Sequence, residues 1–168
     1  RRQRRNRQHR TLNPHDPRRG RLTIAAFETG QELGRTQIEL TRADLIRYAG
    51  ASGDFNPIHW NDRFATEVGL PGVIAHGMLT MGAAVQLVTD WAGCPGKIED
   101  YQTRFTGMVP VADDAGTNPA EAVGATLDVV ATVGKVVDEE RIRVDLEVTL
   151  DGEKVLNRAQ AIVNVAGR

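Results

Sequence analysis

A carboxylate and an imidazole lie five residues apart in the segment 54–62, where Asp54 precedes Asn56-Pro57 and His59 follows them. The Asn-Pro pair predicts a turn, because proline keeps the residue before it out of helical geometry. Asp54 and His59 are therefore not expected on one helical face, and we predict that they approach each other across a bent loop. A carboxylate and a histidine that share one water molecule can move protons at neutral pH.

A second segment that could take part in a reaction is Ala75-His76-Gly77-Met78-Leu79-Thr80, which opens a long apolar stretch. A glycine at the start of a helix leaves backbone N–H groups free and gives a substrate oxygen room to approach. If the two segments converge, an acid–base pair faces a group of N–H donors.

Helices are predicted around both segments. Thr41 and Asp44 have capping-box spacing, so a helix is expected to begin there, after a first strand over 30–40, and to end near Gly50. Asn61 has the position of an N-cap for a short helix that follows the Asp54 loop.

The stretch 77–91 is apolar nearly all round, which is typical of a helix at the centre of a fold. A membrane span needs about 20 apolar residues. This run is shorter and is interrupted by Thr80, Gln86, Thr89 and Asp90, so we expect a buried helix and no membrane partner.

The second half of the chain predicts strands. Residues 141–150 alternate strictly between apolar and polar side chains, and Asp151-Gly152 then predicts a two-residue hairpin turn. Further strands are expected over 97–109, 123–133 and 154–165, and a loop by composition over 113–119. Helices followed by a run of antiparallel strands predict an α+β fold in which the sheet wraps around the apolar helix.

The 168 residues are enough for one domain with a sizeable core. The first 21 residues hold nine arginines and one acid, so we expect a disordered basic tail over 1–21 and a folded domain over 22–168. An arm that binds nucleic acid or an anionic membrane is the alternative for this tail. The remaining chain carries 12 basic and 21 acidic side chains and predicts no nucleic-acid surface, and the single Cys94 indicates a reducing compartment, the cytoplasm.

Each candidate residue also has a structural interpretation. Taken alone, Asp54 is a turn aspartate and His59 a histidine that bonds the backbone; their combination with the Gly77 segment favours catalysis. Asn56 is expected to bond nearby backbone groups, and a structural role is favoured over substrate contact for His76.

Two other chemistries fit the sequence less well. Ser52 lies outside a G-x-S-x-G motif and has no strand before it, so a serine nucleophile is not expected. Asp54, His59 and His76 lack the short paired spacing of zinc ligands, so no metal site is expected.

The segment Tyr48-Ala-Gly-Ala-Ser-Gly-Asp54-Phe-Asn56-Pro57-Ile-His59, followed by the His76-Gly77 segment, resembles the twin signature of the (R)-specific enoyl hydratases, the MaoC-like dehydratases with a hot-dog fold. The resemblance covers about residues 25–166. Within the family, the chain is most similar to the catalytic subunits of the two-subunit (3R)-hydroxyacyl-carrier-protein dehydratases of mycolic-acid elongation.

This resemblance implies reversible hydration of trans-2-enoyl thioesters to (3R)-hydroxyacyl thioesters in fatty-acid metabolism, on coenzyme A or an acyl-carrier protein and without a cofactor. It implies that Asp54 and His59 are the catalytic pair, with either one as the base, and that Gly77 donates its N–H to the thioester carbonyl. Four neighbouring residues are expected to support the site: Asn56, Pro57, His76 and Thr80. Several relatives carry a serine further along this helix, where the present chain offers only the hydroxyls of Thr80 and Thr89.

The resemblance also implies a dimer, either of two copies or with a sister hot-dog subunit. Arg63 and Arg104 are candidates to meet carrier phosphates, although solvated surface positions are the default. Two other functions stay open: a hot-dog thioesterase, and a non-catalytic subunit or acyl-binding module.

Overall fold

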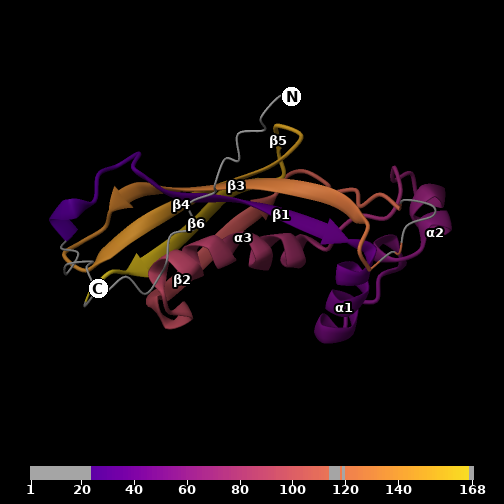
Figure 1. Ribbon diagram of the computed structural model, residues 1–168, viewed down its shortest axis with the longest axis horizontal. Coiled ribbons are helices and arrows are strands. Elements are labelled where there is room, and N and C mark those ends of the chain that lie inside the picture. Colours follow the sequence, from indigo (N-terminus) through magenta and orange to yellow (C-terminus); the bar gives the residue numbers. More distant parts are fainter. Residues whose placement is uncertain (1–23, 114–117, 119, 167–168) are drawn as a thin grey trace, which may run out of the picture.

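The computed structural model describes residues 24–113, 118 and 120–166. The predicted basic tail over 1–21 lies outside these residues, as does most of the predicted loop over 113–119. In the described chain, an antiparallel sheet lies across one long helix, α3 (Gly77–Ala92), with α1 (Arg42–Ser52) and α2 (Asp62–Glu67) at one end (Figure 1). None of the described helices is long and apolar enough to cross a membrane.

The six-stranded sheet has the order β1-β3-β4-β6-β2, and its strands pair antiparallel throughout. The strands are β1 (Glu32–Thr41), β2 (Ile98–Phe105), β3 (Val123–Val136), β4 (Arg141–Leu150), β5 (Glu153–Lys154), which pairs only with β4, and β6 (Leu156–Asn164). Three helices precede most of the strands along the chain, so the predicted α+β class is confirmed. The edges of the sheet are β1 and β2.

The start of α1 follows the capping-box prediction. The side chain of Thr41 accepts from the Asp44 backbone N–H at 3.2 Å, and the Asp44 carboxylate accepts from the Thr41 N–H at 2.9 Å. The helix ends at Ser52 rather than near Gly50, because the left-handed residue that terminates it is Gly53, with φ of 76°.

The predicted hairpin turn is confirmed, whereas two of the predicted strands differ from their expected bounds. Asp151 and Gly152 both have positive φ, 51° and 85°, as a type I′ turn requires. The predicted strand over 154–165 is divided at Val155 into β5 and β6. The predicted strand over 97–109 ends at Phe105, because the next two N–H groups bond the Val155 carbonyl from outside the ladder.

One face of α3 packs into the core, and its buried residues are spaced four apart: Thr80, Ala84, Val88 and Ala92. They meet the inward faces of the strands, where Leu127, Val129, Ile142 and Val144 are at most 1% exposed. This packing fixes the N-terminus of α3 next to the loops that follow α1, which is where the predicted site residues lie.

Three short 3-10 helices complete the described elements: η1 (Ile24–Ala26), η2 (Pro57–His59) and η3 (Pro95–Lys97). Of these, η2 carries His59.

Candidate active site

The loop that carries Asp54 begins directly after the C-cap of α1. The Oδ1 atom of Asp54 accepts from the Asn56 backbone N–H at 3.2 Å, which fixes one carboxylate oxygen and leaves the other free. The Asp54 side chain is 52% exposed, so it is in contact with solvent although its loop is constrained.

His59 is positioned by the 3-10 helix η2. Asn56 caps this helix by accepting from the Ile58 N–H at 3.3 Å, and Pro57 occupies its first turn, where a missing N–H is tolerated. The Nδ1 atom of His59 lies 2.8 Å from the Ile74 carbonyl oxygen. Because a carbonyl only accepts, Nδ1 carries the hydrogen, and Nε2 of the neutral ring holds the lone pair.

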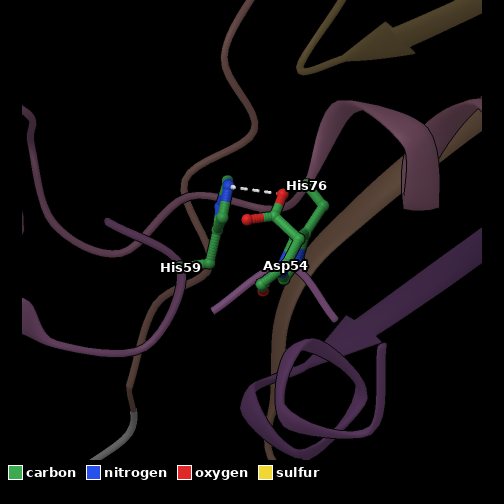
Figure 2. A group of neighbouring side chains, drawn as sticks. All are labelled: Asp54, His59 and His76. Carbon is green, nitrogen blue, oxygen red and sulfur yellow. Dashed lines mark hydrogen bonds and ion pairs between the residues drawn. The ribbon is translucent and has the colours of Figure 1, made fainter. Parts of the chain in front are cut away.

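Asp54 and His59 face each other across the loop (Figure 2). The His59 Nε2 and Asp54 Oδ2 atoms are 4.0 Å apart, too far for a direct hydrogen bond but close enough to contact one molecule between them. The His59 side chain is 9% exposed, so the pair joins a sheltered imidazole to a solvent-facing carboxylate. The structure therefore brings together the two residues that the spacing predicted to meet.

His76 lies beside this pair. Its ring stacks on that of His59, with centroids 3.8 Å apart and planes inclined by 24°, and its Nε2 donates to the Asp54 carbonyl oxygen at 3.2 Å. Burial lowers the pKa of His76, and the nearby His59 lowers it further, while the bond to Asp54 opposes these effects. A structural role was predicted for His76, and these contacts put it in touch with both members of the pair.

Gly77 is the first residue of α3, and His76 is its N-cap. The His76 side chain makes no cap hydrogen bond, because it turns toward Asp54. Among the described residues, no acceptor is found for the Gly77 N–H. The helix tip therefore presents a free donor and the positive end of the helix dipole beside the Asp–His pair.

The ring of Phe105, from the end of β2, covers Gly77. A Cβ atom on residue 77 would lie 3.0–3.2 Å from three atoms of this ring, so a larger residue there would need the Phe105 ring to shift by a few tenths of an ångström. Phe105 was not predicted as a site residue, because its contact with Gly77 joins positions 28 residues apart and leaves no local pattern in the sequence. Tyr48, whose ring centroid is 4.8 Å from that of His76, was quoted only as part of the motif.

Other candidates have local partners. The Thr80 hydroxyl donates to the His76 carbonyl oxygen at 3.4 Å and Thr89 bonds Val85 in the same way, so both hydroxyls bond their own helix. Ser52 donates to the Tyr48 carbonyl oxygen at 2.7 Å, and Arg63 pairs with Glu67 at 2.8 Å. Arg104 is exposed on β2.

Asp54, His59 and His76 each bring a possible ligand atom within 4.8 Å of the others. An imidazole binds a metal through a lone pair in the plane of its ring, and two stacked rings direct such lone pairs side by side rather than at one point. One nitrogen of each ring is also bonded to a backbone carbonyl. These features favour proton transfer, and the expected absence of a metal stays a prediction.

A surface hollow of about 540 Å³ lies elsewhere, at the turn between β3 and β4. It is lined by Glu99, Asp138, Glu139, Glu140, Arg141 and Asn164, none of which is a predicted site residue.

Solved structures with the same architecture place the chain in the hot-dog class. A MaoC-like dehydratase aligns with a TM-score of 0.73 and 33% identity, over 84% of this chain and 42% of that one. The R-hydratase PhaJ1 from Pseudomonas aeruginosa aligns with a TM-score of 0.64 and 26% identity, over 84% of each chain. A chain of the ChsH1-ChsH2 complex from Mycobacterium tuberculosis shares the fold, with a TM-score of 0.66 and 19% identity over 82% of this chain and 97% of that one.

A family model described as MaoC like domain matches residues 25–144, so the chain belongs to the MaoC-like domain family. The 3-hydroxyacyl-thioester dehydratase X of Mycobacterium tuberculosis is 41% identical over 87 residues, which are 52% of this chain and 30% of that protein. The 3-hydroxybutyryl-CoA dehydratase of Methylorubrum extorquens is 29% identical over 145 residues, 80% of this chain and 85% of that protein. The chain thus spans under a third of the first relative and most of the second.

Proposed function

We propose that this chain is an (R)-specific hydratase that interconverts trans-2-enoyl and (3R)-hydroxyacyl thioesters by adding or removing water. The observation that carries the proposal is the 4.0 Å approach of His59 Nε2 to Asp54 Oδ2, beside the uncapped N-terminus of α3. Two similar proteins support it by name, the 3-hydroxybutyryl-CoA dehydratase and the R-hydratase.

In the hydration direction, water bonds through its oxygen to the β-carbon of the enoyl thioester. The lone pair on His59 Nε2 accepts one proton of this water, while Asp54 Oδ2 accepts a hydrogen bond from the other and orients the molecule. The proton taken up by the pair is then delivered to the α-carbon, so no atom is gained or lost beyond the water. A positioned base of this kind typically contributes about 10²–10⁴-fold to the rate.

Negative charge develops on the thioester oxygen as the enolate forms. The Gly77 N–H and the positive end of α3 stabilise that charge, as backbone donors do in other enzymes that form an oxyanion.

The surroundings of the pair suit an acyl thioester. Three exposed apolar side chains adjoin the site residues in sequence or in space: Phe55, Met78 and Phe105. We infer that they contact the acyl chain, its carrier arm or a partner subunit, the partner being a second copy or a sister hot-dog chain. The sequence motifs resemble those of the catalytic subunits of two-subunit carrier-protein dehydratases, so a pair with a sister hot-dog chain is part of the proposal.

Hydration of crotonyl-CoA, followed by loss of enoyl absorbance and chiral analysis of the product, tests the function. Asp54→Asn keeps the shape of an exposed side chain, and His59→Asn keeps a donor toward Ile74 while removing the base at Nε2. We expect each variant to lose about 10²–10⁴-fold in kcat. Asp90→Asn, at the far end of α3, is the matched control and should retain activity.

The same assay separates the other candidate functions. Release of free coenzyme A, detected with a thiol reagent, would identify a thioesterase and contradict the proposal. Unchanged turnover in Asp54→Asn or His59→Asn would refute the mechanism, and binding of acyl thioesters without any turnover would indicate a non-catalytic module.

A further inference from the structure

His76 contacts both members of the acid–base pair and the helix tip at the same time. We infer that His76 is a positioning residue, which holds the Asp54 backbone and the His59 ring in register with the N-terminus of α3. The inference rests on the proposed function and assigns to His76 a role in that site.

The first contact is with the loop. His76 Nε2 donates to the Asp54 carbonyl oxygen at 3.2 Å, which ties the residue that carries the carboxylate to the N-cap of α3. The other hydrogen bonds of Asp54 are to neighbours in the sequence: its N–H donates to Ser52 Oγ at 3.2 Å and its Oδ1 accepts from the Asn56 N–H. The bond from His76 therefore sets where the loop lies relative to the donors at the helix tip.

The second contact is with the base. The His76 ring stacks on that of His59, with centroids 3.8 Å apart and planes inclined by 24°, so it limits rotation of the His59 ring. The Ile74 carbonyl holds the other nitrogen of His59. With the ring plane and one nitrogen both fixed, Nε2 has one direction available, toward Asp54.

Stability alone does not explain a histidine here. His76 is 2% exposed, and its Nδ1 has no hydrogen-bond partner among the described residues. A buried polar atom without a partner destabilises the folded protein, because it loses its hydrogen bonds to water and gains none. An apolar ring would fill the same space without that loss but would not donate to Asp54.

The charge state of His76 also suits this role. Burial lowers the pKa of His76, so the ring stays neutral at a pH where a solvated histidine begins to protonate. The titratable groups that face it are His59, Asp54 and Tyr48. A neutral ring does not repel the imidazolium that His59 becomes when it takes a proton from water.

Two substitutions separate the contacts. His76→Phe keeps an aromatic ring against His59 and loses the donor to Asp54, whereas His76→Gln retains an amide donor and loses the stack. Each should lower kcat by about 10- to 100-fold, since small misplacements of reacting groups have effects of that size. KM should change less than about threefold, because the substrate contacts are unaltered. Tyr48→Phe, which preserves the ring contact with His76, is the control and should stay near wild type.

A second readout does not depend on activity. Long-range ¹⁵N–¹H NMR spectra report which ring nitrogen of each histidine carries hydrogen, and with four histidines in the chain His59→Asn suffices to assign His59. Wild-type His59 should show the Nδ1–H tautomer, and both His76 variants should show a mixture.

The outcomes distinguish the two proposals. Wild-type protein without hydratase activity would defeat the proposed function, while the NMR result would still decide whether His76 orders His59. An unchanged kcat together with an unchanged His59 tautomer in folded His76→Phe and His76→Gln would overturn the positioning role. Loss of the fold in both variants, seen by circular dichroism, would make His76 a core residue and would overturn it as well.

Discussion

At the scale of single residues, the site depends on which hydrogen-bonding groups are already occupied. His59 Nδ1 is bonded to Ile74 and one Asp54 oxygen to Asn56, so only His59 Nε2 and Asp54 Oδ2 remain to face each other. The N-cap His76 leaves the tip of α3 free because its side chain bonds elsewhere. Each of these occupied groups narrows the chemistry that the remaining atoms can perform.

The Gly77 donor can be removed without breaking the helix. Proline is favoured at the first helical position, and His76 already has φ of −61° and ψ of 133°, the extended geometry that proline requires before it. We expect Gly77→Pro to lower kcat about 10²–10³-fold, because one N–H to the developing oxyanion is lost. Steady-state kinetics on crotonyl-CoA, with thermal unfolding as a check on the fold, measures this effect.

Gly77→Ala is the matched control for that experiment. It places a Cβ against the same Phe105 ring, which is half exposed and able to shift, but it keeps the N–H. Its loss of kcat should therefore be clearly smaller than that of the proline variant. Equal losses in the two variants would mean that crowding against Phe105, and not the donor, explains the effect.

At the scale of elements, one arginine links the helices that frame the site. Arg42 of α1 donates to the Val111 carbonyl oxygen at 2.6 Å and to both carboxylate oxygens of Asp62 of α2, at 2.8 and 3.0 Å. Asp62 in turn accepts from the Val73 N–H at 3.2 Å, just before the His76 segment. The loops on both sides of the site are thus held to one network.

This network predicts a pH-dependent stability. The hydrogen bonds from Arg42 lower the pKa of Asp62 in the folded state. Their contribution is therefore fully present above the unfolded pKa, about 3.9, and is lost as the pH falls through the lower folded value. Asp62→Asn should reduce the free energy of unfolding at pH 7 by about 1 kcal/mol, a figure kept small because Asp62 is half exposed.

Urea denaturation of wild type and Asp62→Asn at pH 7, 5 and 3 measures that difference. The difference between the two proteins should be smaller at pH 3 than at pH 7, because Asp62 of the unfolded wild type is then largely protonated, and it should vanish only below the lowered pKa of folded Asp62. Asp100→Asn, an exposed carboxylate on β2, provides the comparison and should show little difference at any pH. A gap between wild type and Asp62→Asn that is independent of pH would contradict the ion-pair explanation.

At the scale of the whole molecule, one protomer leaves apolar surface uncovered near its site. The edge strand β2 ends at the exposed Phe105, and α3 buries only one of its faces in the sheet. Unpaired edges and exposed apolar groups of this kind are where subunits associate. We therefore expect the chain to function as part of a dimer.

Light scattering of the purified chain tests this expectation. A self-associating protein should show twice the 18.4 kDa mass of one chain, and its activity per chain should fall on dilution as the dimer dissociates. A protein that requires a sister subunit should gain activity when that subunit is added. Full activity in a species of 18.4 kDa would contradict both arrangements.

Features that depend on neighbours in sequence were predicted well. The Thr41–Asp44 capping box, the Asn61 cap and the Asp151-Gly152 turn follow from local backbone chemistry, and each lies where it was expected. The α+β class followed from the spacing of apolar residues. Alternating segments bury their apolar side chains as strands with one inward face, and the long apolar segment buries its own as a central helix. Two boundaries were predicted wrongly. The helix predicted to end near Gly50 continues to Ser52, and the single strand predicted over 154–165 is divided at Val155. Several glycines or apolar residues in a row are each compatible with the end of an element, so the local sequence does not select one of them.

By itself, the sequence determined that a carboxylate, an imidazole and a glycine-led helix were available at suitable spacing, because proline and asparagine shape the loop between the first two. The tertiary structure alone decided which nitrogen of His59 is free, that His76 stacks on it and that Phe105 covers Gly77. These relations join residues that lie 15 to 28 positions apart in the chain. They exist only once the sheet packs on α3 and brings the ends of β2, η2 and α1 to the same place.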